Sequence, residues 1–163
     1  TLEDAIQINE KYINLLKEKI IPIKNSTEIL KYLYDKKYEL YIVTNGPSKV
    51  VMDKLIQINV QNLIKDIFSA EEAGYMKPHR EFFDKFFSKT NNYNTEEMLI
   101  IGDELEKDIL GGIQNKIDTC WFNPKKLNNN KYKINYEICD LLELKKILWY
   151  RGKKDERNCI CNT

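Results

Sequence analysis

The sequence predicts an α/β fold in which a parallel, Rossmann-like sheet is flanked by helices. Short apolar runs alternate with longer segments whose apolar residues recur at helical spacing, and this alternation is typical of βαβ units. The runs at 40–43 and 98–101 are apolar throughout, as in strands that helices cover on both faces. The length of 163 residues suits one such domain, and a 42% share of hydrophobic residues is enough to bury a core.

Each element follows from local patterns of apolar residues, caps and breakers. The predicted helices are 3–20, a helix capped by Asn25 or Ser26 that runs through Leu33, a helix through 50–58, a helix over 82–87 with Pro78 at its first position, 104–115 and 140–148. The predicted strands are 40–43, 67–69, 98–101 and 119–122. Residues 125–135 are predicted as a loop, and 149–163 as a frayed tail.

Composition excludes several classes of partner. The net charge of +1 and the pI of about 7.5 offer no basic surface for nucleic acid, and no apolar run is long enough to span a membrane. The acidic start of the chain, 1–4, does not resemble a signal peptide. We expect a cytoplasmic protein whose cysteines are reduced thiols, because a Cys-x-Cys pair without a companion is a poor zinc site. The cysteines are Cys120, Cys139, Cys159 and Cys161.

Two candidate groups for binding an anion fall at the predicted carboxyl edge of the sheet, where parallel sheets bind their ligands. Thr44, Asn45 and Gly46 follow the first predicted strand. Their hydroxyl, amide and backbone N–H groups could hold phosphate oxygens, although Asn-Gly is also an ordinary turn signal. Lys77 precedes Pro78, which favours an extended backbone. Its ammonium could point across the edge at an anion, or it could be a solvated surface group.

Two carboxylates, Asp103 and Asp108, flank the point where the strand at 98–101 ends and a helix begins. This arrangement suits a hard divalent cation beside a phosphate. The alternative is that the two carboxylates cap the helix. Gly111 and Gly112 within that helix each cost about 1 kcal/mol relative to alanine. They therefore indicate close packing against a neighbouring element.

Taken in this order, the pieces resemble the motifs of the haloacid dehalogenase-like hydrolase superfamily. The strand that ends in Thr44 resembles the second motif of that superfamily, and the segment around Lys77 resembles the third. Gly102 and Asp103, followed by Asp108, resemble the fourth.

The resemblance extends from about residue 8 to about residue 148. Within the superfamily, the segments 42–46, 108–112 and 119–124 look most like those of the pyrimidine-nucleotide phosphatase subgroup.

The resemblance implies a magnesium-dependent phosphomonoester hydrolase that acts on a nucleotide or another small phosphate ester through an aspartyl-phosphate. Asp103 would coordinate magnesium directly, and Asp108 would do so directly or through a water. Thr44 and Lys77 would be catalytic, and Lys77 would also hold the nucleophile ionised. The implied phosphate-binding residues are Thr44, Asn45, Gly46 and Lys77.

The sequence departs from the family at the first motif, because no two aspartates are separated by one residue. The resemblance implies that this Asp-x-Asp supplies the nucleophile and lies on the central strand, before a helical cap. We therefore expect residues 1–22 to be the end of that cap. Residues 23–148 would form a partial core that lacks the central strand, and 149–163 a C-terminal tail. Such a chain is expected to be marginally stable, and inactive as a phosphatase by itself.

Two alternative functions remain open. A dehalogenase of the same superfamily needs no metal, so the pair Asp103 and Asp108 argues against it. A non-catalytic remnant that binds phosphate or a partner is favoured by the absent nucleophile. The DNA upstream of the codon for Thr1 would discriminate the enzyme from the remnant, because an in-frame Asp-x-Asp there would restore the enzyme and a stop codon would leave the remnant.

Overall fold

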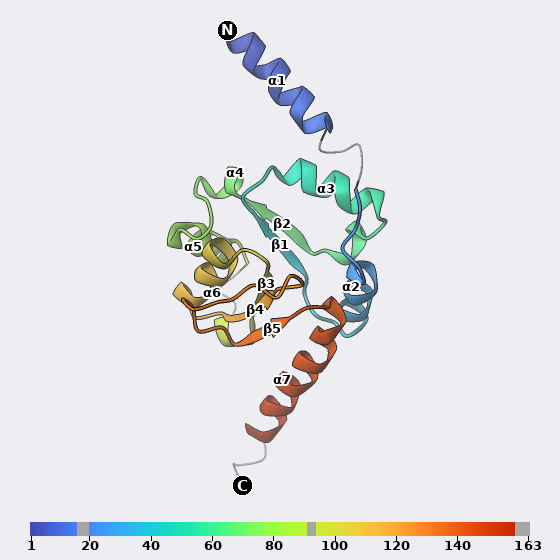
Figure 1. Cartoon of the computed structure of the whole chain (residues 1–163), viewed down its shortest axis with the longest axis vertical. Coiled ribbons are helices and arrows are strands. Elements are labelled where there is room, and N and C mark those ends of the chain that lie inside the picture. Colours follow the sequence, from blue (N-terminus) through green and yellow to red (C-terminus); the bar gives the residue numbers. More distant parts are fainter. Residues whose placement is uncertain (16–19, 91–93, 159–163) are drawn as a thin grey trace.

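The computed structural model describes residues 1–15, 20–90 and 94–158, and it confirms an α/β fold of parallel strands with flanking helices (Figure 1). Each predicted strand is present within one residue of its expected position. A further strand, β5, was missed because it follows a polar loop and is only three residues long. The strands of the described part are β1 (Tyr41–Thr44), β2 (Asp66–Ser69), β3 (Leu99–Gly102), β4 (Asp118–Phe122) and β5 (Tyr136–Ile138).

The described strands form two parallel sheets, one of β1 and β2 and the other in the order β3-β4-β5. In the first sheet Thr44 is level with Ser69, and in the second Gly102 is level with Trp121. Within the described residues no ladder joins β1 to β3. The four residues of β1 are half-buried, so this strand is less covered than its apolar sequence predicts. The further strand expected between the two sheets stays a prediction.

The helices depart from the predictions mainly at their ends. Predicted helix 3–20 ends at Leu15 in the described residues, 16–19 lie outside them, and residue 20 is not helical. Predicted helix 104–115 is a π-helical turn, η3 (Leu105–Ile109), that leads into α6. The α-helices are α1 (Leu2–Leu15), α2 (Ser26–Asp35), α3 (Ser48–Gln57), α4 (Ala70–Ala73), α5 (Arg80–Lys89), α6 (Leu110–Gln114) and α7 (Leu144–Asn158), and short 3₁₀ turns cover Gln61–Leu63, Thr95–Glu97 and Leu141–Glu143.

One predicted cap and one predicted helix start are wrong, although α2 begins at Ser26 as expected. Asn25 precedes α2 in a left-handed conformation, with φ of 65°, and its side chain makes no cap bond. The amide of Asn25 instead donates to both carboxylate oxygens of Asp140 at 2.8 Å. The backbone N–H of Leu142, which donates to Asp140, lowers the pKa of this carboxyl most, and the bonds from Asn25 lower it further. Pro78 is not the first residue of α5, which begins at Arg80.

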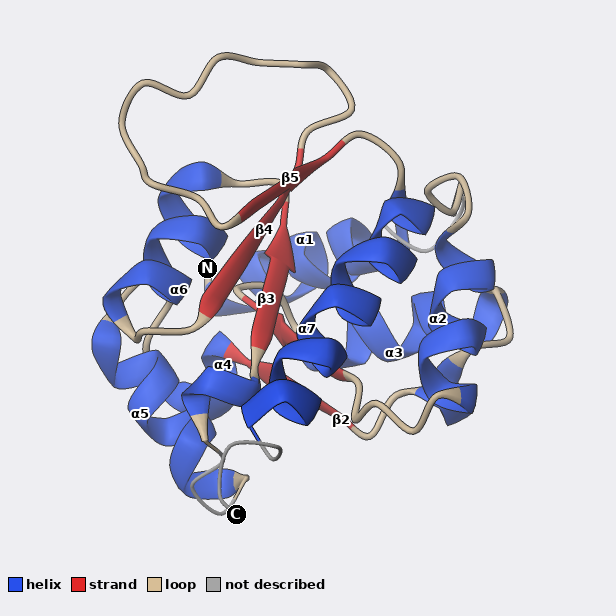
Figure 2. Cartoon of the chain, turned by 90° about the horizontal axis from the view of Figure 1, so that it is seen from below, coloured by secondary structure: helices blue, strands red, loops and turns tan. Residues whose placement is uncertain are grey.

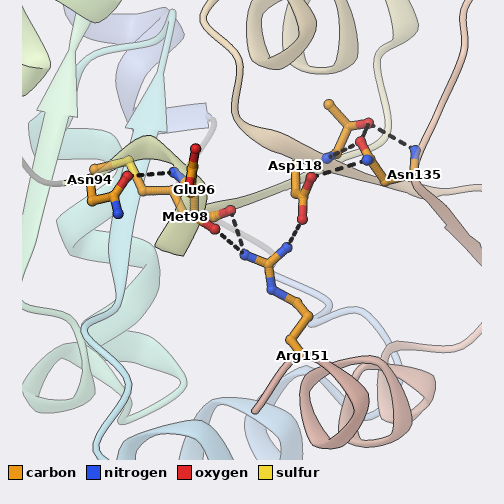
Figure 3. A network of polar contacts seen from close by, with 7 residues as sticks. Asn94, Glu96, Met98, Asp118, Asn135 and Arg151 are labelled. Carbon is orange, nitrogen blue, oxygen red and sulfur yellow. Dashed lines mark hydrogen bonds and ion pairs between the residues drawn. The ribbon is translucent and has the colours of Figure 1, made fainter. Parts of the chain in front are cut away.

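The predicted frayed tail is wrong for residues 149–158, because α7 continues to Asn158. Arg151 anchors this helix to the amino ends of β3 and β4 (Figure 3). Its guanidinium forms an ion pair with Asp118 and donates to the carbonyls of Glu96 and Met98 at 3.1 and 3.0 Å. Residues 159–163 lie outside the described residues.

Helices cover the β3-β4-β5 sheet on both sides (Figure 2). On one side the phenylalanines of α5 pack with Phe68 of β2 and Ile100 of β3, as predicted for that helix. The other side is formed by α2 and α7, with Ile29 and Leu144 at its centre. The apolar side chains of α1 at Leu2, Ile6, Ile8 and Tyr12 are exposed. In the described part of the chain, no helix has the length and apolar character that crossing a bilayer requires.

The predicted close packing at Gly111 and Gly112 is confirmed. A Cβ on Gly111 would lie 2.6 Å from the ring of Phe83. A Cβ on Gly112 would lie 2.5 Å from a methyl group of Ile100 and 2.7 Å from one of Thr119. These distances are far inside van der Waals contact, so α6 can lie this close to α5 at Gly111, and to β3 and β4 at Gly112, because neither residue has a side chain.

Replacing Gly112 by alanine is therefore expected to destabilise the fold by about 2 kcal/mol, since overpacking a well-filled core typically costs 1–3 kcal/mol. Urea denaturation measures this change in the free energy of unfolding. Gln114→Ala on the exposed face of the same helix is the matched control, and it should change stability by less than about 0.5 kcal/mol. Equal stability of Gly112→Ala and the wild type would contradict the packing described.

Candidate functional site

The residues predicted at the carboxyl edge come from three segments. Thr44 is the last residue of β1. Its Oγ1 accepts the backbone N–H of Gly46 at 2.9 Å, which forms a tight turn at the end of the strand. Because the hydroxyl oxygen is the acceptor in this bond, its own proton stays available for donation to an anion.

Lys77 lies in the turn between α4 and α5, and not at the start of a helix as predicted. Its Nζ donates to the carbonyl of Val43 at 2.8 Å and to Oδ1 of Asp108 at 2.6 Å. The side chains of this ion pair are only 10% and 12% exposed. An ammonium has three N–H groups, so one remains beyond these two bonds. Lys77 thus joins the end of β1 to the turn that follows β3.

Asp108 is held in place from two sides within η3. Its Oδ1 accepts from Lys77, and its Oδ2 accepts the backbone N–H of Glu104 at 3.2 Å. The carboxylate also lies directly against the end of β3, because a Cβ on Gly102 would come within 2.3 Å of Oδ2. Glycine at position 102 is therefore a steric requirement for the placement of Asp108.

Asp103 has an exposed side chain, while its carbonyl accepts the indole N–H of buried Trp121 at 3.0 Å. Trp121 is thereby one of the groups that fix the turn carrying Asp103. The Glu104 carboxylate, paired with Lys107 at 2.6 Å, raises the pKa of that lysine, and the charges of Asp108 and Asp103 add to the effect. The turn is therefore a region of concentrated negative charge.

The donor set of this turn fits magnesium in part. Magnesium prefers hard oxygen ligands and commonly takes one or two carboxylates together with phosphate oxygens and waters. Asp103 offers such a carboxylate, whereas both oxygens of Asp108 already accept protein N–H groups. In the described part of the chain, no three acidic, histidine or cysteine side chains cluster as a complete metal site. The protein groups alone would thus leave coordination positions for a phosphate.

Asn45 is oriented differently from the phosphate ligand that the sequence suggested. Its Oδ1 accepts the backbone N–H of Lys77 at 2.7 Å, and its Nδ2 donates to the carbonyl of the same residue at 3.1 Å. The structure therefore brings together Thr44, Asn45, Lys77 and Asp108, with Asp103 on the adjoining turn.

Sequence reasoning missed the contact between this turn and the loop after β4. Glu106 of η3 accepts from Lys131 at 2.8 Å and from the hydroxyl of Tyr132. The lysine bond is the main reason that the pKa of Glu106 is lowered. The partners are 25 and 26 residues apart, so no local pattern marks them.

The fold and the site define an α/β domain that presents a lysine, a hydroxyl and acidic side chains at the carboxyl edge of parallel strands. The family profile described as "Haloacid dehalogenase-like hydrolase" matches residues 2–122. The chain therefore belongs to the haloacid dehalogenase-like hydrolase family.

Among curated relatives, the HAD-hydrolase YfnB of Bacillus subtilis is 37% identical over 146 residues, which cover 89% of this chain and 62% of YfnB. The pyrimidine 5'-nucleotidase PynA of Streptococcus pneumoniae is 28% identical over 143 residues, which cover 87% of this chain and 60% of PynA. The chain thus spans about six-tenths of the length of these relatives.

Solved structures agree on the fold. A crystal structure of YfnB from Bacillus subtilis bound to magnesium superposes with a TM-score of 0.80 at 36% identity, and the match covers 89% of this chain and 63% of that one. The HAD phosphatase of Thermococcus onnurineus superposes with a TM-score of 0.75 at 24% identity, covering 86% of this chain and 64% of that one. The second likeness concerns the fold alone.

Replacing Gly102 by alanine is expected to move Asp108 away from β3 and to break its bond with Lys77. We expect a loss of about 2 kcal/mol in the free energy of unfolding, as for other overpacked sites. Gly46→Ala is the matched control for stability, because its Cβ would meet Thr44 Oγ1 at an ordinary 3.5 Å. Urea denaturation of both variants tests this, and equal midpoints for the two would contradict the steric role of Gly102.

Proposed function

We propose that the chain is part of a magnesium-dependent phosphomonoester hydrolase that acts on a nucleotide or another small phosphate ester. The observation that carries this proposal is the Lys77 ammonium, which is held between the end of β1 and Asp108 with one N–H left over. The ammonium and the Thr44 hydroxyl lie at the edge where an α/β sheet receives its ligand. Phosphatases among the relatives support the same class of reaction.

In this proposal the residues of the chain bind and neutralise the phosphoryl group. Lys77 and Thr44 would donate to phosphate oxygens, whereas the one backbone N–H of Gly46, also suggested by the sequence as a phosphate ligand, is donated to Thr44 Oγ1. Magnesium would be held by Asp103 directly and by Asp108 directly or through a water, and when bound it offsets negative charge on the transferring group. Trp121 would help to hold Asp103 in position, because its indole N–H donates to the Asp103 carbonyl.

The attacking carboxylate is not supplied by an Asp-x-Asp of these 163 residues. In the mechanism that the family implies, an aspartate oxygen attacks phosphorus and the alcohol leaves, and water then cleaves the aspartyl-phosphate. The chain would thus contribute the half of the site that binds phosphate and cation. By itself it is expected to bind phosphate without turning over an ester.

The relatives support two classes of substrate. PynA supports a pyrimidine nucleotide as substrate. A glyceraldehyde 3-phosphate phosphatase of Methanocaldococcus jannaschii is 31% identical over 98 residues and supports a smaller phosphate ester. A non-catalytic phosphate-binding module is the second candidate, and the absence of an Asp-x-Asp favours it. A dehalogenase ranks below both, because its chemistry would give Asp103 and Asp108 no cation to hold.

The test is a panel of phosphomonoesters, nucleotides included, assayed with magnesium and with EDTA. The product of the complete reading frame is expected to release phosphate only with magnesium, and the 163-residue chain is expected to release none. Asp103→Asn should lower kcat/KM more than tenfold, or about 1.4 kcal/mol. Asp35→Asn, an exposed acid at the end of α2, is the control and should leave kcat/KM unchanged.

Turnover by the 163-residue chain would contradict the missing-nucleophile part of the proposal. A loss of less than tenfold in Asp103→Asn would contradict the metal assignment. No turnover by the complete product with any ester would favour the binding module.

A further inference from the structure

The amide of Asn45 and the peptide group of Lys77 form a closed pair of hydrogen bonds. The Lys77 N–H donates to Oδ1 at 2.7 Å, and Nδ2 donates to the Lys77 carbonyl at 3.1 Å. The two residues are 32 positions apart, one just after β1 and the other in the turn between α4 and α5. The side-chain amide of Asn45 thus pairs with both the N–H and the carbonyl of Lys77, as the backbone of a neighbouring β-strand would.

The turn that carries Lys77 has few other attachments. Its preceding residues, Tyr75 and Met76, are 44% and 54% exposed. Gly74, which opens the turn, has a left-handed φ of 73° and no atom within 4 Å of the position where a Cβ would stand. These three residues contribute little packing to the turn, and the polar contacts of Asn45 and Lys77 join it to the end of β1.

The position of the ammonium depends on this anchor. Lys77 reaches back to the carbonyl of Val43, the residue two positions before Asn45, and to Asp108. The lysine is thus tied to the end of β1 at its backbone by Asn45 and at its tip by Val43. With both ends fixed, the remaining N–H has a defined place at the carboxyl edge.

We propose that Asn45 is a positioning residue, which acts on the phosphate through Lys77, and that its side chain is not itself a phosphate ligand. This inference rests on the proposed function in that Lys77 is taken to hold the phosphate. Turning the amide toward a ligand would break both bonds to the Lys77 backbone and leave the ammonium held only at its tip, by Val43 and Asp108. The inference revises the role that the sequence suggested for Asn45.

The first test is a double-mutant cycle on the binding of inorganic phosphate to the 163-residue chain. Binding is measured by NMR titration with phosphate concentrations up to the millimolar range. The variants are Asn45→Ala, Lys77→Met and the double variant. Asn45→Ala is expected to weaken phosphate binding at least fivefold when Lys77 is present, and by less than twofold in the Lys77→Met background. An equal loss in both backgrounds would mean that Asn45 contacts phosphate directly, and it would overturn the proposal.

The second test needs no phosphate. Hydrogen exchange at the Lys77 backbone N–H is expected to accelerate at least tenfold in Asn45→Ala, with exchange in β2 unchanged. Asn45→Asp should retain most of the protection, because a carboxylate still accepts that N–H. Asn62→Ala, at an exposed asparagine between β1 and β2, is the control for a general effect on stability.

The two tests separate the possible failures. If the wild-type chain binds no phosphate but Lys77 exchange accelerates in Asn45→Ala, the proposed function fails while the anchoring stands. If Lys77 exchange is the same in Asn45→Ala and the wild type, the anchoring is wrong whatever the phosphate titration shows.

Discussion

The ion pair between Lys77 and Asp108 is the interaction on which the rest of this structure depends. The two sheets share no backbone ladder in the described residues, yet Lys77 bonds to the end of β1 in one sheet and to the turn after β3 in the other. The pair is nearly buried. Removing one partner would leave an uncompensated charge, and in buried pairs this is more destabilising than loss of the whole pair.

Fold and site are constrained by the same close approaches. Gly102 lets Asp108 lie against β3, and Gly111 and Gly112 let α6 lie against Phe83 and Ile100. A bulkier residue at Gly102 or Gly112 would push η3 or α6 away from the sheet, and one at Gly111 would push α6 away from α5. Asp103 and Asp108 therefore lie at the carboxyl edge because η3 and α6 pack closely after β3. The chemistry of the turn depends on this packing.

Local patterns in the sequence predicted much of this arrangement. Apolar runs predicted β1 to β4, and the phenylalanines predicted the buried face of α5. The paired glycines predicted the close packing of α6. The end of β1 and the turn after β3 were expected to lie close together, and Lys77, which bonds to both, shows that they do. The comparisons then confirmed the family to which the ordered motifs pointed.

The remainder depends on contacts between distant residues. The sequence predicts that Asn25 caps a helix, but its amide donates to Asp140, which is 115 residues away. The polar end of α7 reads as frayed, yet Arg151 ties it to Asp118 and to two backbone carbonyls. Asn45 reads as a ligand, although Lys77 engages both ends of its amide. Polar side chains with several possible partners are the ones whose roles a single sequence leaves open.

The most direct measurement is a double-mutant cycle on the free energy of unfolding, with Lys77→Met, Asp108→Asn and the double variant. Each single substitution should cost about 3 kcal/mol because it leaves its partner buried and unpaired, whereas the double variant should cost clearly less than the sum. The exposed pair of Lys131 and Glu106 offers a control, in which a smaller coupling is expected. Additive costs at Lys77 and Asp108 would contradict the claim that this pair joins the two sheets.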